Sequence, residues 1–292
     1  MNILLKVLLL SLICGTAFSE ICFPFAIDTA VAYDTFRSLP DGSWEGNTGA
    51  LASLNIGTPL PYLSEYGFDV QVGGSYGLYD WPGRGSALEG SLSRLQQQGF
   101  LTAALSRTTY CEFGFNLAVA YDWMFNSQFG AFALNTNFSQ FRYLAAYQIC
   151  CSDEIGVWGT VHTNTSHKTT IDFPVAFRAV DQINLFWRHL FSNCAQTDIW
   201  VGFPYGKGLM FSRPGEFIIG ASFQAPLTDC LSVEGRGMYM AAHHDKSINM
   251  SKNYASNICI GIHYTFGCGC CQKPYLPIAN NSNFIADTNL NY

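Results

Sequence analysis

The sequence is poor in charge, and after its first residues it has no long apolar run. Asp, Glu, Lys and Arg make up 12% of its 292 residues, and the formal net charge is −6. So little basic charge argues against nucleic acid as a partner. No run after residue 19 approaches the roughly 20 apolar residues that a membrane-crossing helix needs. The mature chain is therefore expected either to be soluble or to cross a membrane as strands.

The start of the chain carries an export signal. Lys6 precedes an apolar run from Val7 to Ile13, and Ala17-Phe18-Ser19 follows as a small-x-small cleavage pattern. A basic residue, a short apolar run and small residues in this order are typical of a secretory signal peptide. We expect cleavage near Ser19. The mature protein then enters a compartment in which cysteines can form disulfides.

The rest of the chain alternates between apolar and polar side chains. Between Cys111 and Met124, for example, apolar residues such as Leu117 alternate with small or polar ones such as Asn116. This period of two is that of a strand with one apolar and one polar face. The pattern predicts twelve strands, near residues 24–34, 49–57, 67–79, 95–107, 111–124, 140–149, 153–162, 178–190, 197–203, 216–225, 230–241 and 257–266. If the first fails, 129–135 is the reserve.

The connections between these strands alternate in length, which is typical of outer-membrane barrels, as is an even strand count. Aromatic residues near strand ends, such as Phe113 and Trp123, fit the girdles of such barrels. The sequence therefore predicts an all-β fold, a transmembrane antiparallel up-and-down β-barrel of about twelve strands in outer-membrane lipid. A soluble β-sandwich is the alternative. The long connections are expected at 35–48, 80–94, 125–139, 163–177, 204–215 and 242–256.

The last predicted strand ends in a recognisable pattern. Gly261, Tyr264 and Phe266 form a Gly-x-x-aromatic-x-aromatic run. It looks like the terminal β-signal of outer-membrane barrels, and this resemblance implies the barrel assembly machinery as a partner. We therefore divide the chain into a signal peptide (1–19), an outer-membrane β-barrel (20–266) and a cysteine-containing periplasmic tail (267–292).

The cysteines gather beside the short connections and the two ends of the predicted barrel. The set comprises Cys22, Cys111, Cys150, Cys151, Cys194, Cys230, Cys268, Cys270 and Cys271. This arrangement resembles the cysteine-bearing major outer-membrane proteins and porins of chlamydia-like bacteria, whose envelopes are described as stiffened by disulfide-linked proteins. The resemblance implies disulfides to other cysteine-rich envelope proteins or to a second copy of the chain. Disulfides within one chain are an equal alternative, because the connectivity of the cysteines does not follow from the sequence.

Charged residues on the polar strand faces are the candidate lining of a pore. They are Asp69, Glu112, Asp122, Glu154, Arg178, Arg188, Asp198, Glu216, Glu234 and Arg236. Because acids predominate, we expect a porin-like passive channel for small hydrophilic solutes with a weak preference for cations. A structural or surface-exposed barrel without an open pore, serving in envelope stiffening or adhesion, is the alternative.

Enzymatic and metal functions are not expected from the sequence. An outer-membrane lipase or protease would need a nucleophile, a histidine and an acid brought together, and the sequence does not assign such a group. The run Cys268-Gly269-Cys270-Cys271 lacks the second cysteine pair typical of zinc sites. We expect no metal and no cofactor.

A thiol-labelling experiment tests the predicted orientation. A membrane-impermeant thiol reagent applied to intact cells should leave the native cysteines unlabelled, because they are expected at the periplasmic end. A cysteine introduced at Asn164 or Ser247, in the long connections, should react. Mass spectrometry identifies the labelled sites. Labelling of reduced Cys194 or Cys230 from outside would invert the topology.

Overall fold

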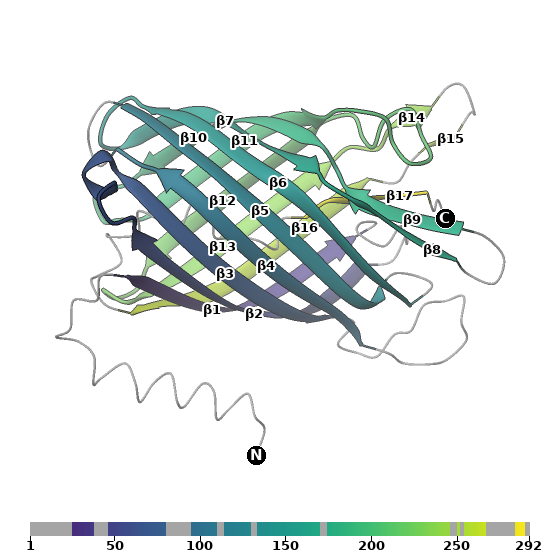
Figure 1. Ribbon diagram of the computed structural model, residues 1–292, viewed down its shortest axis with the longest axis horizontal. Helices are drawn as coiled ribbons and strands as arrows, with labels where there is room; N and C mark the ends of the chain where they lie inside the picture. The colour runs from purple at the N-terminus through teal and green to yellow at the C-terminus, as the bar shows by residue number, and fades with distance from the viewer. Residues whose placement is uncertain are drawn as a thin grey trace, which may run out of the picture.

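The computed structural model describes residues 25–37, 46–79, 95–109, 114–129, 133–169, 174–245, 250–251, 254–266 and 284–289. Twelve strands close into an antiparallel barrel, shown in Figure 1, in the order β1-β16-β13-β12-β11-β10-β7-β6-β5-β4-β3-β2. These strands are β1 (Ala26–Arg37), β2 (Gly46–Pro59), β3 (Phe68–Tyr79), β4 (Gln96–Arg107), β5 (Gly114–Phe129), β6 (Leu134–Gln148), β7 (Asp153–His162), β10 (Gln182–Leu190), β11 (Gln196–Pro204), β12 (Ile218–Pro226), β13 (Leu231–Met240) and β16 (Ala255–Phe266).

The predicted all-β barrel of twelve strands is confirmed, and each barrel strand corresponds to one that the alternation predicts. The first and last strands complete the ladder, with Val31 of β1 opposite Ile262 of β16. Closure matters because it leaves no barrel strand with an unpaired edge. The first strand therefore forms as predicted.

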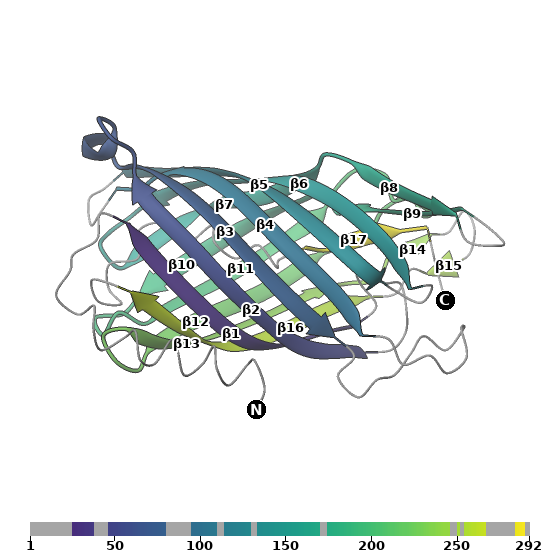
Figure 2. The ribbon, with the colours of Figure 1, turned by 60° about the horizontal axis from the view of Figure 1, so that its bottom comes forward.

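The two ends of the barrel differ. The short-turn end carries the connections 60–67, 108–113, 149–152, 191–195 and 227–230, and the opposite end is called the long-loop end. The short 3-10 helix η1 (Ser64–Tyr66) lies at the short-turn end, as Figure 2 shows. In the described part of the chain, no helix is long and apolar enough to cross a membrane.

One predicted long connection is wrong. β5 continues to Phe129 and β6 begins at Leu134, so most of the segment 125–139 is strand, and 129–135 forms no additional strand. Its polar residues suggested a loop. Asn126 and Thr136 are instead opposite each other in the wall, and the Asn126 amide donates to the Thr136 hydroxyl at 3.3 Å. Polar side chains that face a barrel interior need no loop to accommodate them.

The predicted strand 178–190 is in fact two strands. β9 (Pro174–Ala179) leaves the wall, and β10 begins at Gln182. Asp181 fixes the corner, because its carboxylate accepts the His162 backbone N–H at 2.6 Å and its carbonyl accepts the Tyr205 N–H at 2.9 Å. The predicted loop 163–177 accordingly contains β8 (Thr165–Thr169) and the start of β9.

Two small ladders lie at the long-loop end (Figures 1 and 2). β8 and β9 form a three-stranded sheet with β17 (Ala286–Thr288), in the order β17-β9-β8. β14 (His244–Asp245) pairs with β15 (Met250–Ser251). The first of these sheets brings a C-terminal strand against a segment more than 100 residues earlier in the chain.

The C-terminal segment Phe284–Thr288 runs from the lumen, where Phe284 packs against Phe100 and Phe138, to β9 at the long-loop end. Phe266, which ends β16, is at the short-turn end, whereas β17 pairs with β9 at the other end. Asp287 is fully buried; it accepts the Leu209 N–H at 2.7 Å and lies 3.6 Å from the Arg178 guanidinium. Part of the segment that the sequence assigns to a periplasmic tail is thus docked in the lumen.

Asp287→Ala should loosen this segment while leaving the barrel closed. The change removes a buried acceptor from Arg178 and from the Leu209 N–H, which costs roughly 1–3 kcal/mol. A carboxypeptidase should then shorten the refolded variant faster than the wild type, as followed by mass spectrometry. Asp229→Ala, in the exposed β12–β13 turn, is the control. Equal trimming of the two variants would contradict the docking of β17.

Candidate functional site

The barrel wall has two faces of opposite character. Along β5, Asn116 and Asp122 are buried on the lumen side, whereas Leu117 and Val119 on the other face are 47% and 53% exposed. This follows from the period of two in a strand. Every barrel strand exposes at least one large apolar side chain, and one from each in chain order is Val31, Leu54, Val72, Leu101, Leu117, Phe141, Val157, Leu185, Val201, Ile219, Tyr239 and Ile260.

Outward aromatic rings gather towards the two ends of the wall. At the short-turn end, the rings of Phe115 and Tyr147 pack edge-on with centroids 5.1 Å apart. Towards the long-loop end, Tyr121 contacts Trp123 at 4.3 Å and Phe141 at 4.7 Å. Aliphatic side chains of β5 lie between the two groups. Of the two residues named for the predicted girdles, Trp123 belongs to the second group, and Phe113 lies outside the described residues.

Near the short-turn end of the lumen, one arginine joins two acids across three strands. Arg188 of β10 lies 2.6 Å from Glu154 of β7 and 2.6 Å from Asp198 of β11. Asn116 donates to Glu154 at 2.7 Å, and Ser222 donates to Asp198 at 3.0 Å. The chain of contacts runs from β5 to β12. It holds two carboxylates with one guanidinium, so its formal charge is negative.

A second group of contacts joins the strands at which the barrel closes. His263 of β16 has Nδ1 3.0 Å from Asp28 of β1 and Nε2 2.8 Å from Glu234 of β13. A histidine donates from both nitrogens only when it is protonated. Thr265 also donates to Asp28, at 3.1 Å. This group again places two carboxylates around one basic side chain.

A third ion pair joins β5 and β6 on the inner face, at the level of Tyr121 and Phe141. Arg142 of β6 makes two bonds to Asp122 of β5, from Nε at 2.8 Å and from Nη2 at 3.0 Å. Thr102 and Gln140 donate to the same carboxylate at 2.6 and 3.1 Å. Because Asp122 is fully buried, these four bonds compensate for the water that the carboxylate loses.

Apolar side chains in the long-loop half of the lumen pack against the C-terminal segment. The ring of Phe284 lies 5.8 Å from both Phe100 of β4 and Phe138 of β6. Ile285 is buried in a cluster that includes Phe186 and Trp200. Wall residues and this segment together fill much of the lumen at this level.

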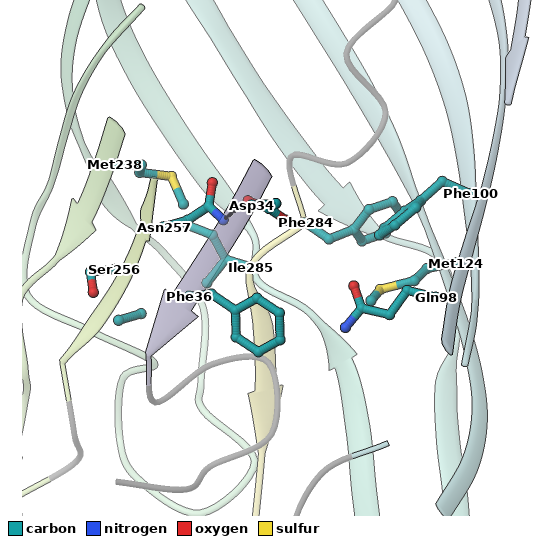
Figure 3. A pocket seen from close by; sticks show the side chains of 11 residues that line it. Asp34, Phe36, Gln98, Phe100, Met124, Met238, Ser256, Asn257, Phe284 and Ile285 are labelled. Carbon is teal, nitrogen blue, oxygen red and sulfur yellow. Dashed lines mark hydrogen bonds between the residues drawn. The ribbon is translucent and has the colours of Figure 1, made fainter. Parts of the chain in front are cut away.

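A pocket separates the C-terminal segment from part of the wall (Figure 3). Asp34 and Gln98 lie on its lining together with Phe36, Phe100 and Met124. The carboxylate of Asp34 accepts bonds from Tyr79 and Asn257, each at 2.7 Å. The pocket combines one held carboxylate with aromatic and sulfur-containing side chains.

Most of the predicted lining residues do face the lumen. Asp69, Asp122, Glu154 and Arg236 are buried on inward faces of the barrel strands, and Arg188, Asp198 and Glu234 join the contacts described above. Asp69 of β3 accepts the Thr108 hydroxyl at 3.4 Å. The structure brings Asp122, Glu154, Arg188, Asp198 and Glu234 into pairs and triplets of opposite charge, which the sequence did not indicate.

Two predicted lining residues lie elsewhere, and one lies outside the described residues. Arg178 belongs to β9, which has left the wall, and it contacts Asp287 and the Lys207 carbonyl. Glu216 precedes β12 and is exposed at the long-loop end, where it contacts His243. Glu112 falls in the undescribed residues 110–113.

Four inward residues on which the lumen contacts depend are not among the lining residues predicted from the sequence: Asp28, Asp34, Arg142 and His263. Each lies in a predicted strand and on its inward face, so the alternation could have found them. Their pairing could not be found in this way, because it depends on which strands are neighbours and in what register.

The described cysteines lie where the sequence analysis expected them. Cys150 and Cys151 are in the β6–β7 turn, Cys194 in the β10–β11 turn and Cys230 in the β12–β13 turn, all at the short-turn end. Cys150 and Cys230 are free thiols. Within the described ranges, no group of three His, Cys, Asp or Glu side chains could hold a metal ion. Cys22, Cys111, Cys268, Cys270 and Cys271 lie outside those ranges.

The residues of the candidate assembly signal lie in the strand that closes the barrel. Gly261, Tyr264 and Phe266 are in β16, which pairs with both β1 and β13. A Cβ at Gly261 would come within 2.8 Å of the Ala32 Cβ, so glycine allows the two closing strands to approach there. The rings of Tyr264 and Phe266 are 4.8 Å apart.

Comparison with known proteins gives a family and a set of barrels. A family model described as a family of unknown function, DUF6666, matches residues 26–286. No curated protein matches the sequence. Among solved structures, the KdgM porin shares 7% identity over 81% of this chain and 99% of its own, with a TM-score of 0.45. The outer membrane phospholipase A from Escherichia coli shares 8% identity over 83% of this chain and 94% of its own, with a TM-score of 0.45.

A third match is to the β domain of the Bordetella autotransporter BrkA, with 10% identity over 83% of this chain and 99% of that one, and a TM-score of 0.45. At these identities and scores the matches carry no information on the activity of this chain. The resemblance to proteins of chlamydia-like bacteria finds no support among them.

The Asp122–Arg142 pair gives a stability test of the lumen. Arg142→Leu leaves a buried carboxylate without its cation, which costs roughly 3–5 kcal/mol. Adding Asp122→Asn should recover more than half of that loss, because the amide is neutral and can still accept from Thr102. The stability of both variants can be measured as the urea concentration at which half of the protein is unfolded. Folded and unfolded protein are distinguished by their mobility on gels. An Arg142→Leu variant as stable as the wild type would mean that the pair is hydrated and unimportant.

Proposed function

The chain belongs to the family of unknown function DUF6666, and we propose that it is an outer-membrane β-barrel forming a narrow, acid-lined passage for small hydrophilic cations. The observation that carries this proposal is the opposition of the two wall faces. Apolar side chains are exposed around the whole outside, and charged side chains lie inside. A soluble protein has the reverse arrangement.

The outer face supports the membrane location. A continuous apolar surface around a closed barrel would be costly in water, where monomeric proteins rarely expose large apolar patches. In lipid the same surface is favourable, and the aromatic rings near both strand ends suit the two interfaces. The closed ladder also satisfies the backbone of the barrel strands without water, as lipid requires.

The asymmetry of the two ends supports an orientation. Short turns face the periplasm in outer-membrane barrels, and long loops face outward. In this orientation Cys150, Cys194 and Cys230 would lie on the periplasmic side, together with the start of β1 that follows the expected cleavage near Ser19. In that compartment the free thiols of Cys150 and Cys230 can form disulfides with cysteine-rich envelope proteins, with a second copy or within the chain.

The lumen supports a passage for cations. Its inward acids are Asp28, Asp34, Asp69, Asp122, Glu154, Asp198 and Glu234, and its inward bases are Arg142, Arg188, Arg236 and His263. The Arg188 and His263 groups each hold two carboxylates around one base. Low-dielectric walls focus the resulting negative field, and such linings favour cations.

A second candidate function has an observation of its own. Phe284 and Ile285 fill part of the long-loop half, together with β9 and inward residues such as Phe138. A barrel sealed in this way would act through its surface loops or its disulfides, as an envelope or adhesion protein, with no open pore.

Reversal potentials in planar bilayers test the passage. Under a KCl gradient at low salt, the refolded protein should prefer K⁺ to Cl⁻ by a few-fold. The preference should fade as the Debye length falls from about 30 Å at 0.01 M to about 3 Å at 1 M. Asp69→Asn should lower the preference, whereas Asp229→Asn, in an exposed turn, should leave it unchanged. Phe284→Ala should raise the conductance by loosening the docked segment.

The possible results separate the two candidates. Anion preference in the wild type would mean that the arginines dominate the narrowest part, and would contradict the acid-lined passage. Absence of conductance in both the wild type and Phe284→Ala would favour the sealed barrel.

A further inference from the structure

Three polar side chains at the long-loop end form a hydrogen-bonded chain outside the lumen contacts described above. The Oγ of Ser212 lies 2.9 Å from Nε2 of His243, and Nδ1 of the same ring lies 2.5 Å from Oε1 of Glu216. Ser212 and Glu216 come from the β11–β12 connection, and His243 follows β13. One imidazole thus links a hydroxyl on one side to a carboxylate on the other.

The backbone around the group holds its members in place. The Glu216 N–H donates to the Ala241 carbonyl at 3.1 Å, and the Ala241 N–H donates to the Phe217 carbonyl at 2.9 Å. These bonds continue the pairing of β12 with β13 beyond Ile218 and Met240. Glu216 and His243 therefore sit on an extension of the barrel wall.

Gly215 permits the close approach of the two segments. A Cβ at this position would lie 2.8 Å from the Met240 side chain and 3.1 Å from the Ala241 carbonyl oxygen. With glycine there, the chain passes directly over the end of β13, and Ser212 is brought back to the imidazole. The arrangement is not evident in the sequence, because His243 lies 31 residues after Ser212 and 27 residues after Glu216.

The order of the contacts fixes the direction in which a proton would move. If Nδ1–H donates to the Glu216 carboxylate, Nε2 carries the lone pair and accepts the Ser212 hydroxyl proton. A serine, a histidine acting as base and an acid that orients it make up the triad of serine hydrolases, which is recognised by geometry on unrelated folds. Ser212 is exposed, so a substrate can reach its oxygen.

We propose that Ser212, His243 and Glu216 form a catalytic triad that hydrolyses carboxylic esters at the rim of the barrel. Ser212 Oγ bonds to the ester carbonyl carbon while His243 Nε2 takes the hydroxyl proton. The carbon–oxygen bond to the alcohol then breaks, and the proton passes from His243 to that alcohol. Water, deprotonated by His243, attacks the acyl-serine in turn; the carboxylic acid leaves, and Ser212 regains its proton.

The surroundings point to an ester with an apolar acyl chain. Phe217 follows Glu216 directly and is 45% exposed on the outer face. Its ring lies 6.3 Å from Tyr239, which lies 5.7 Å from Tyr254. This aromatic group adjoins the triad at the long-loop edge of the apolar outer face of the wall. A substrate whose acyl chain lies along that face would bring its ester bond to the level of Ser212.

A fluorophosphonate probe tests the triad in the full mature barrel, refolded in detergent. One adduct per chain is expected at Ser212, identified by mass spectrometry, and Ser212→Ala should carry none. Ser127→Ala, which removes another hydroxyl at the same rim, should label normally. p-Nitrophenyl palmitate should be hydrolysed faster than p-nitrophenyl butyrate, and Ser212→Ala should lower both rates at least about 10³-fold.

Glu216 is a positioning residue and needs a different readout. Glu216→Gln should slow labelling about 10²-fold or more, and Glu216→Asp should restore part of the rate. A folded barrel that takes no probe would overturn the proposal, as would labelling or hydrolysis that persists in Ser212→Ala. Faster hydrolysis of the butyrate would overturn the assigned acyl chain. Bilayer conductance should be the same in Ser212→Ala and in the wild type. The proposed triad and the proposed passage can therefore be refuted separately.

Discussion

The alternation of side chains along the closed ladder is the constraint on which the rest of the structure depends. A slip of one residue in any barrel strand would exchange its two faces. Leu117 would then enter the lumen and Asn116 would leave it. Closure between β1 and β16 makes the twelve registers mutually dependent. A change of register would therefore disrupt the apolar outer face and the charged inner face at the same time.

A second constraint is that charged side chains buried in the lumen need partners that replace water. Asp122 is held by four donors, and Arg188 lies between two carboxylates. These contacts tie together strands that the backbone ladder already pairs, and they leave the lining negative. Towards the long-loop end, the buried carboxylate of Asp34 is likewise held by Tyr79 and Asn257. There the C-terminal segment packs as an ordinary core element would, with Phe284 against Phe100 and Phe138.

The sequence was sufficient to predict the strands because a period of two is a local property. It failed where the structure depends on distant contacts. The corner at Asp181 depends on His162 and Tyr205, and the place of Arg178 depends on Asp287. The stretch around Asn126 and Thr136 resembles a loop in sequence, because polar residues line a polar lumen as readily as they fill a loop. Ser212 and His243 meet only because the β11–β12 connection returns over the end of β13, where the β12–β13 pairing continues to Glu216 and Ala241.

The central claim is that the outer face of this barrel contacts lipid and its inner face does not. Two single-tryptophan variants test it in vesicles of lipid brominated near the headgroup end of the acyl chain, since bromine quenches tryptophan by contact. One retains Trp187, which is 43% exposed on the outer face; the other retains Trp200, which is 6% exposed on the inner face. If the outer face contacts lipid, Trp187 should be strongly quenched and Trp200 only weakly. Equal quenching of the two, or quenching of Trp200 alone, would contradict it.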